Sequence, residues 1–536
     1  MSTPSIHNLD HLGLVAGMCR ELRIADIIDA VIPKHGEHAV THGQTLVAML
    51  INGLGFHSGT LHMFSEFFAN KPTERLIGPG IEARHLTDDV LGRCLDSLYE
   101  VGVCELYQVI AEQVVGRLGL GESDLHLDIT SFHVDGRYAG DEEDDVKRLR
   151  LVKGYSRDHR PELNQVVLEM MCENQAGIPV FMQALNGNSN DQKSFAEVSR
   201  LHLKSLKAAQ NSNYLVGDAA LYTEESIQAL HEQGQHFVTR VPMTLKDARE
   251  AVCTLQSQEL KDFGDGYSGQ WLTSEYAGVQ QRWLLVRSEQ ATARGEQTVL
   301  RRIEKDRQAD DKALKRFFKQ RFACEADARQ ALEVFSSSLK VSVLSSPQLV
   351  TYDVFARPGR PKKDESPIRQ EYGFTSERQD NEAILAQRHA QAGVFILATN
   401  DMDGDMTMAS LLAIYKQQQR VERGFRFLKS PDFLTSALFL KKPERIEALL
   451  MVMTCTLMIY AALEHRIRQE LRSQNQTFPD MKNKPTQTPT ARWVFIKFMG
   501  IHELILPDGP PMITGTKDCA NTVIQILGET YEQIYS

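Results

Sequence analysis

The sequence predicts an α/β protein in which a mixed-sheet core carries an inserted domain and follows an N-terminal helical domain. Three observations predict this class. Apolar residues recur at helical spacing up to residue 118, strand-like and helix-like runs alternate from residue 124 to 241, and the alternation resumes at Gly393 after a less regular stretch. At roughly 100–200 residues per domain, a chain of 536 residues corresponds to about three or four domains.

Residues 1–120 are predicted to form a helical domain that binds DNA, dimerises or does both. Thr41 and Gln44 form a capping-box pattern ahead of an apolar run, and Thr87 followed by two aspartates marks a further helix start. A helical cap on the core explains the same pattern equally well, because no single residue of this region reads a DNA base.

Residues 121–243 are predicted to be the first part of the core. The segment 124–130 alternates, with Leu125, Leu127 and Ile129 on one face and Asp128 on the other. Strand-like runs follow at 165–171, 178–185, 214–218 and 236–241, with helix-like stretches at 192–209 and 223–233. Neighbouring strands followed by alternating helix and strand predict a mixed sheet.

The second half of the chain divides into three predicted units. Residues 244–392 are an insertion domain, with a strand-like run at 281–286 and helix-like runs at 314–322 and 326–339. Residues 393–472 are the second part of the core: a buried strand at 393–399, a long helix at 404–430, and a helix at 442–472. Its apolar run, Leu449–Leu463, is interrupted by Thr454 and Thr456 and predicts a buried helix, not a membrane span. Residues 473–536 are a C-terminal segment.

Three acidic residues have settings that suggest chemistry. Asp128 lies on the polar face of a strand, Asp218 follows a core strand where open α/β sheets place their ligands, and Glu422 lies on the helix after the last core strand. Taken singly, each residue has a simpler explanation. Asp128 is then a solvated strand residue, Asp218 a turn residue and Glu422 one half of a surface ion pair. Together, the three carboxylates are suited to a pair of Mg²⁺ ions that catalyse phosphoryl transfer.

The predicted helix at 404–430 places polar residues on one stripe. At about 100° per residue, Tyr415, Gln418, Glu422, Arg426 and Lys429 share a face. The adjacent stripe is apolar and suited to packing on a sheet; it comprises Ile414, Val421, Phe425 and Leu428. Glu422 therefore lies at the boundary between a core face and a polar face.

Two stretches are basic in a chain whose net charge is −10. Residues 416–445 contain eight Lys or Arg and three Asp or Glu, and residues 146–160 contain six and one, so each has a net charge of +5. Phosphates are the natural partners of such surfaces. The second stretch, which includes Arg157 and Arg160, is either a loop near Asp128 that contacts DNA or a charged hairpin neutralised by the acidic run at 141–145.

The pattern Tyr415-x2-Gln418-x3-Glu422-x6-Lys429 resembles the Tyr-x2-Arg-x3-Glu-x6-Lys signature of bacterial insertion-sequence transposases with an Asp-Asp-Glu triad. The blocks 127–130, 154–165 and 216–222 resemble the first-Asp, following-loop and second-Asp blocks of the branch with a long insertion before the Glu. The resemblance extends from about residue 5 to 465. One position departs, because Gln418 replaces an arginine; Arg426 is the better candidate to supply the missing charge.

The resemblance implies an RNase H-like core in which Asp128, Asp218 and Glu422 bind two Mg²⁺ ions, with Mn²⁺ able to substitute. It implies hydrolysis at the element's ends, followed by attack of the freed 3′-hydroxyl on target DNA. The expected partners are double-stranded DNA, as terminal inverted repeats and target, and a second copy of the chain in a synaptic homodimer. The expected DNA contacts are Tyr415, Gln418, Arg426, Lys429, Arg157 and Arg160.

Two other functions fit the same sequence. One is a transposase derivative that holds terminal repeats as a repressor without cutting, and the other is a structure-specific nuclease that cuts without joining. The location expected for all three is the bacterial cytoplasm, associated with the nucleoid when bound to DNA. The scattered cysteines without a CxxC pair, and a start without a basic and apolar leader, are typical of that compartment.

Overall fold

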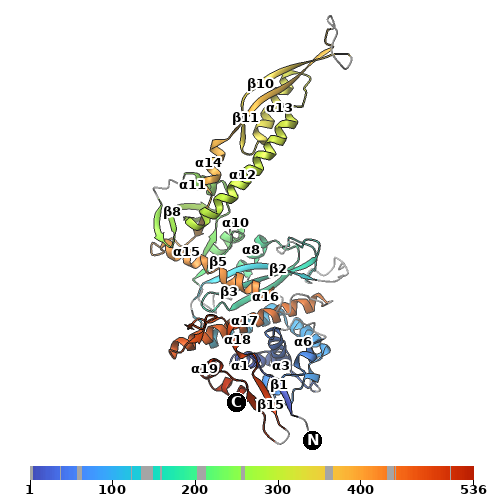
Figure 1. Cartoon of the computed structure of the whole chain (residues 1–536), viewed down its shortest axis with the longest axis vertical. Helices are drawn as coiled ribbons and strands as arrows, with labels where there is room; N and C mark the ends of the chain where they lie inside the picture. Colours follow the sequence, from blue (N-terminus) through green and yellow to red (C-terminus); the bar gives the residue numbers. More distant parts are fainter. Residues whose placement is uncertain are drawn as a thin grey trace.

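The computed structural model of the chain describes residues 4–536 except 35, 37, 57–62, 122, 135–148, 157–159, 202–212, 255–259, 357–365, 431–439, 441 and 507–508. The chain is a mixed α/β protein built on a large sheet. A mainly helical body at one end of the molecule holds both termini, and an arm extends away from the sheet at the other end (Figure 1). The predicted mixed sheet and N-terminal helical region are confirmed.

The large sheet has nine strands in the order β4-β3-β2-β5-β6-β12-β9-β8-β7. Its first half comprises β2 (Leu125–Val134), β3 (Asn164–Glu173), β4 (Pro179–Asn186), β5 (Tyr214–Gly217) and β6 (His236–Arg240). The strands β2, β3 and β4 are antiparallel neighbours, whereas β5 runs parallel to β2 and β6 parallel to β5. The helices α8 (Asp191–Leu201) and α10 (Glu224–Glu232) connect these strands and pack on each other.

The second half of the sheet reaches into the segment predicted as an insertion. It comprises β12 (Val394–Thr399), β9 (Val279–Ser288), β8 (Tyr267–Tyr276) and β7 (Lys261–Gly264), all antiparallel to their neighbours. The arm follows, with α12 (Glu289–Phe317), α13 (Glu325–Ser338), β10 (Ser342–Val354), β11 (Arg369–Asp380) and α14 (Glu382–Ala390). Residues 244–392 thus contribute three strands to the large sheet before they leave it.

The N-terminal helices and the C-terminal segment form one body. The helices are α1 (Leu12–Glu21), α2 (Ile24–Val31), α3 (His42–Gly53), α4 (Phe64–Phe68), α5 (Thr73–Leu76), α6 (Asp88–Val101) and α7 (Val103–Leu118). The predicted capping box of Thr41 and Gln44 begins α3. Strand β1 (Ser5–Asn8) pairs with β15 (His502–Ile505), and the hydroxyl of Tyr535 donates to the carbonyl of Asp10 at 2.7 Å. The two ends of the chain therefore stabilise each other.

The helix α17 (Pro443–Ser473) joins this body to the sheet. It packs against α1, α3, α6 and α7 on one side and against β4 on the other. By length and composition it is the one helix in the described part of the chain that could cross a membrane, yet 89% of its most apolar window is buried within the protein. It is a core helix, as the interrupted apolar run predicts.

The prediction of a single helix over 404–430 was wrong. The structure has α15 (Met408–Lys416) and α16 (Gln419–Leu428), separated by a turn at Gln417 and Gln418. The N–H groups of Gln417, Gln418 and Arg420 bond to carbonyls three residues earlier, which winds the chain more tightly than an α-helix. The angles calculated for a continuous helix therefore do not relate Tyr415 to the residues of α16.

Candidate active site

Asp128 lies on β2, and Asp218 directly follows the adjacent strand β5. In the parallel pairing of β2 and β5, His126 is opposite Val216. Two residues further along each chain are Asp128 and Asp218, and neighbouring strands are about 4.8 Å apart. Strand β2 is buried on both faces, and Asp128 is one of its two half-buried residues. The sheet register thus brings the first two predicted acidic residues together.

The turn after β5 fixes the side chain of Asp218. Its Oδ1 accepts the N–H of Ala220 at 2.9 Å, and its backbone carbonyl accepts the hydroxyl of Thr239 at 2.7 Å. An aspartate that bonds to the backbone two residues ahead stabilises such a turn. Asp128 is held in a similar way, because its Oδ1 accepts the N–H of Ile129 at 2.8 Å. One oxygen of each carboxylate is therefore fixed by the local backbone.

Glu422 is carried by α16, which packs on the sheet through one apolar face. Val421, Phe425 and Leu428 are all buried, as the predicted apolar stripe requires. Gly424 lets the helix approach α17 closely, since a Cβ there would lie 2.9 Å from Cδ2 of Leu457. The side chain of Glu422 is exposed and has no hydrogen bond or ion pair with any residue that the structure describes.

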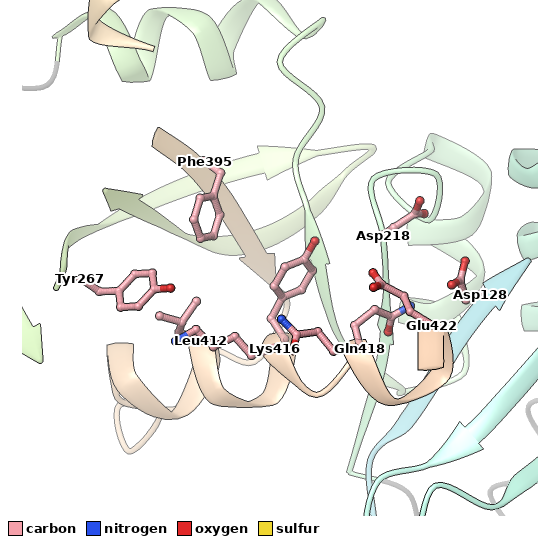
Figure 2. A pocket seen from close by; sticks show the side chains of 10 residues that line it. Asp128, Asp218, Tyr267, Phe395, Leu412, Lys416, Gln418 and Glu422 are labelled. Atoms are coloured by element: carbon pink, nitrogen blue, oxygen red, sulfur yellow. The ribbon is translucent and has the colours of Figure 1, made fainter. Parts of the chain in front are cut away.

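The three carboxylates line one pocket of about 280 Å³. Figure 2 shows Asp128, Asp218 and Glu422 near one another at one end of this pocket, with Tyr267 and Phe395 at the other end. The remaining lining residues come from α15 and the start of α16: Leu412, Tyr415, Lys416, Gln418 and Gln419. The structure therefore brings together the three acidic residues that the sequence analysis selected.

Gln418 was predicted to contact DNA, but its side chain is used within the protein. It is buried, its Nε2 donates to the carbonyl of Leu127 at 2.8 Å, and its Oε1 lies 3.0 Å from Nδ1 of His126. Burial lowers the pKa of His126 to about 4, so the ring is neutral and its Nδ1–H donates to Gln418. Gln418 thus ties the start of α16 to β2.

Tyr415 and Lys416 add two further polar groups to the pocket. Burial raises the pKa of Tyr415, and the charges of Asp218, Glu422 and Asp128 raise it further. The phenol therefore stays protonated at neutral pH and can donate a hydrogen bond. The Nζ of Lys416 lies 3.9 Å from the ring centroid of Tyr267, which holds a positive charge at the far end of the pocket.

The other predicted DNA contacts do not line the pocket. Arg426 is exposed on α16, and Nζ of Lys429 lies 5.7 Å from the ring centroid of Phe132. Arg160 is exposed and forms an ion pair with Glu162. Arg157 lies outside the described residues, so its predicted role is not addressed by the structure.

Sequence reasoning missed five lining residues: Tyr267, Phe395, Leu412, Lys416 and Gln419. Tyr267 and Phe395 come from strands more than a hundred residues apart, and no local pattern connects them. Lys416 is the one member with a sequence signal, since it adjoins Tyr415 and begins the basic stretch 416–445.

The donor chemistry of the pocket fits divalent cations. All three acidic ligands are carboxylates, which Mg²⁺ prefers. Among the described residues, no three His, Cys, Asp or Glu side chains are arranged to hold one ion in common.

Two family models match the chain. A model described as transposase DDE domain matches residues 121–459, and a model described as a domain of unknown function (DUF4277) matches residues 4–112. Among solved structures, the chain is similar to the piggyBac transposase in a cryo-EM structure of its synaptic complex with hairpin DNA. That alignment has 9% identity and a TM-score of 0.38, and it covers 93% of this chain and 83% of the other. No curated protein matches the chain.

Proposed function

The chain belongs to the transposase DDE domain family, and we propose that it cleaves DNA at the ends of an insertion sequence and joins those ends to target DNA. The observation that carries this proposal is the shared pocket of Asp128, Asp218 and Glu422. Each residue comes from a sequence block that resembles the transposase pattern, and the three elements that carry them meet at one edge of the pocket.

We further propose that β2 to β6 form the RNase H-like core implied by the sequence resemblance. Its support is the arrangement of three antiparallel strands followed by two parallel strands. In this arrangement, Asp128 and Asp218 occupy neighbouring strands, and α16 lies over β2 and β3 with Glu422 at its exposed edge.

The three carboxylates would hold two Mg²⁺ ions, or Mn²⁺ in their place, and such ions activate an attacking oxygen and stabilise the leaving one. The protein's own residues have separate tasks. Backbone N–H groups orient Asp128 and Asp218. The protonated phenol of Tyr415 would donate to a phosphate oxygen, and Lys416 would contribute positive charge toward the DNA backbone.

Two successive reactions follow from one site of this kind. In the first, water attacks the phosphorus at the element's end, the bond to the 3′-oxygen breaks, and a 3′-hydroxyl and a 5′-phosphate are released. In the second, that 3′-hydroxyl attacks a phosphorus of target DNA and displaces a target 3′-oxygen. We propose double-stranded DNA as the substrate of both steps, a homodimer as the form that pairs two ends, and the bacterial cytoplasm as the location.

The products of one assay distinguish this function from its two rivals. A plasmid carrying the element's own ends is incubated with the wild type and with Glu422→Gln, in Mg²⁺ and in EDTA. Glu232→Gln serves as the matched control, because Glu232 is an exposed helical glutamate outside the pocket. The proposal expects excised and joined products in Mg²⁺ from the wild type and the control, and none from Glu422→Gln or in EDTA.

Other outcomes would assign the rivals. Nicked DNA without joined products indicates a structure-specific nuclease on the same core. Bound ends that are never cut indicate a repressor. Unchanged excision and joining by Glu422→Gln would remove Glu422 from the mechanism and contradict the proposal.

A further inference from the structure

A second hollow adjoins the pocket of the three carboxylates. Its volume is about 610 Å³, and Tyr267 and Phe395 line both it and the first pocket. Because the two hollows share wall residues, they adjoin each other, the first at the carboxylates and the second at the base of the arm. We call the second hollow the arm groove.

The arm groove is walled by the start of α12 and carries positive charge. Arg294, Thr298 and Arg302 lie on successive turns of that helix and line the groove. No Asp or Glu belongs to its lining. The first pocket, in contrast, contains three carboxylates, so the two adjoining hollows carry charges of opposite sign.

The basic lining continues as a stripe along α12. At about 100° per residue, an arc of about 100° on this helix contains six Lys or Arg and no Asp or Glu. We call these six residues the arm stripe: Arg294, Arg301, Arg302, Lys305, Lys312 and Arg316. The opposite face is the one buried in the arm, through Ile303, Asp310, Leu314 and Phe317. Figure 1 shows α12 running outward from beside β8 to α13, so the stripe leads away from the sheet.

The arm stripe is exposed and not neutralised. All six side chains are exposed, and within the described residues none of them forms an ion pair. By contrast, Arg307 lies off the stripe on the same helix and pairs with Asp380. Unpaired positive charges in a row on one face repel one another, and a bound polyanion neutralises that repulsion.

We propose that the arm groove and the arm stripe bind the phosphate backbone of the DNA that extends from the active site toward the arm. The inference rests on the proposed function, because the carboxylate pocket defines where the cleaved bond lies. From Arg294 to Arg316 the stripe is about 33 Å long at 1.5 Å per residue. At 3.4 Å per base pair, that length corresponds to about 10 base pairs of duplex on one side of the cleaved bond.

Lysines and arginines that contact phosphates leave a measurable signature in the salt dependence of binding. Each contact contributes about 0.9 to the slope of log K against log salt concentration. The triple variant Arg301→Gln/Lys305→Gln/Lys312→Gln should therefore lower that slope by up to about 2.7 and weaken binding at low salt by more than about tenfold. Lys315→Gln is the matched control, because Lys315 is exposed on the same helix but lies outside the arc.

Binding is measured in EDTA on terminal duplexes that differ only in how far they extend past the cleavage site on each side. The wild type should lose affinity when the arm-side duplex is trimmed from about 12 to about 3 base pairs, and the triple variant should not. Circular dichroism melts of each variant show whether it is folded. Because no cleavage is required, this result stands apart from the excision assay.

Three results would overturn the inference. The first is a folded triple variant with the salt slope of the wild type, and the second is a Lys315→Gln variant that weakens binding as much as the triple variant does. The third is an affinity that does not depend on duplex length on either side; the arm stripe would then face an acidic protein surface. If the excision assay fails while the DNA affinity still depends on the length of the arm-side duplex, the transposase function is rejected and DNA binding by the arm is retained.

Discussion

The side-chain amide of Gln418 donates to the carbonyl of Leu127 at 2.8 Å, one residue before Asp128. This bond connects the first turn of α16, which carries Glu422, to the strand that carries Asp128. The N–H of Glu422 bonds to the carbonyl of Gln418, so the two residues lie one helical turn apart. The position that carries arginine in the transposase signature is therefore occupied in this chain by a buried amide that joins α16 to β2.

Gln418→Ala should lower the single-turnover rate of DNA cleavage by about 10- to 100-fold, because displacing a reacting group by about 1 Å has effects of that size. The dissociation constant for terminal DNA should change little, since Gln418 is buried. Gln417→Ala is the control, because the Oε1 of Gln417 is buried without a hydrogen-bond partner among the described residues. Weaker DNA binding with an unchanged cleavage rate would show that Gln418 contacts DNA after all.

His126 should make the fold sensitive to acid. Its pKa is about 4 in the folded chain against 6.5 ordinarily, so between these values the unfolded chain binds a proton that the folded chain excludes. The free energy of unfolding should fall by about 3 kcal/mol as the pH drops through this window. The His126→Asn variant, whose amide can still donate to Gln418, should lack this part of the fall in the free energy of unfolding. Urea titrations at successive pH values measure it. In the same variant, His11, whose pKa is also about 4, should still contribute its own fall in the free energy of unfolding.

Tyr415→Phe tests the phenol as a phosphate donor. The ring should keep its place, because it packs against a buried apolar cluster that includes Leu411 and Leu412, and only the hydroxyl is lost. Cleavage at saturating DNA should slow by about tenfold, the effect of one lost hydrogen bond to a charged group. A rate within twofold of the wild type would assign Tyr415 a packing role.

Gly154→Ala should destabilise the fold without a direct effect on DNA. A Cβ at Gly154 would lie 2.0 Å from the backbone carbonyl oxygen of Gly187, which also accepts Nε2 of Gln165 at 2.6 Å. Forcing these backbones apart should cost about 1–3 kcal/mol in free energy of unfolding, measured by denaturant titration. Gly404→Ala is the control, since no atom lies within 4 Å of a Cβ there. Equal stability of the two variants would contradict this account of the 154–165 block.

Local patterns in the sequence locate the strands of the core and select three acidic residues that line one pocket in the structure. Period-two alternation located β2, and a Gly-Asp turn located Asp218. At the break before α16, Gln418 bonds to Leu127, which is almost three hundred residues away in the sequence. Helical periodicity carries no information about such a contact. The strands β7 and β8 are half-exposed and polar, so their alternation is weak, and Tyr267 was missed with them.

The central claim is that Asp128, Asp218 and Glu422 act as one unit on one phosphodiester bond. The most direct test measures cleavage of a labelled terminal duplex by Asp128→Asn, Asp218→Asn, Glu422→Gln and the double variant Asp128→Asn/Glu422→Gln, with binding measured on the same samples. The account predicts that each single variant binds DNA but loses at least about 10³-fold in cleavage rate, and that the double variant is no slower than the singles. Wild-type cleavage by any single variant, or losses that multiply in the double variant, would contradict it.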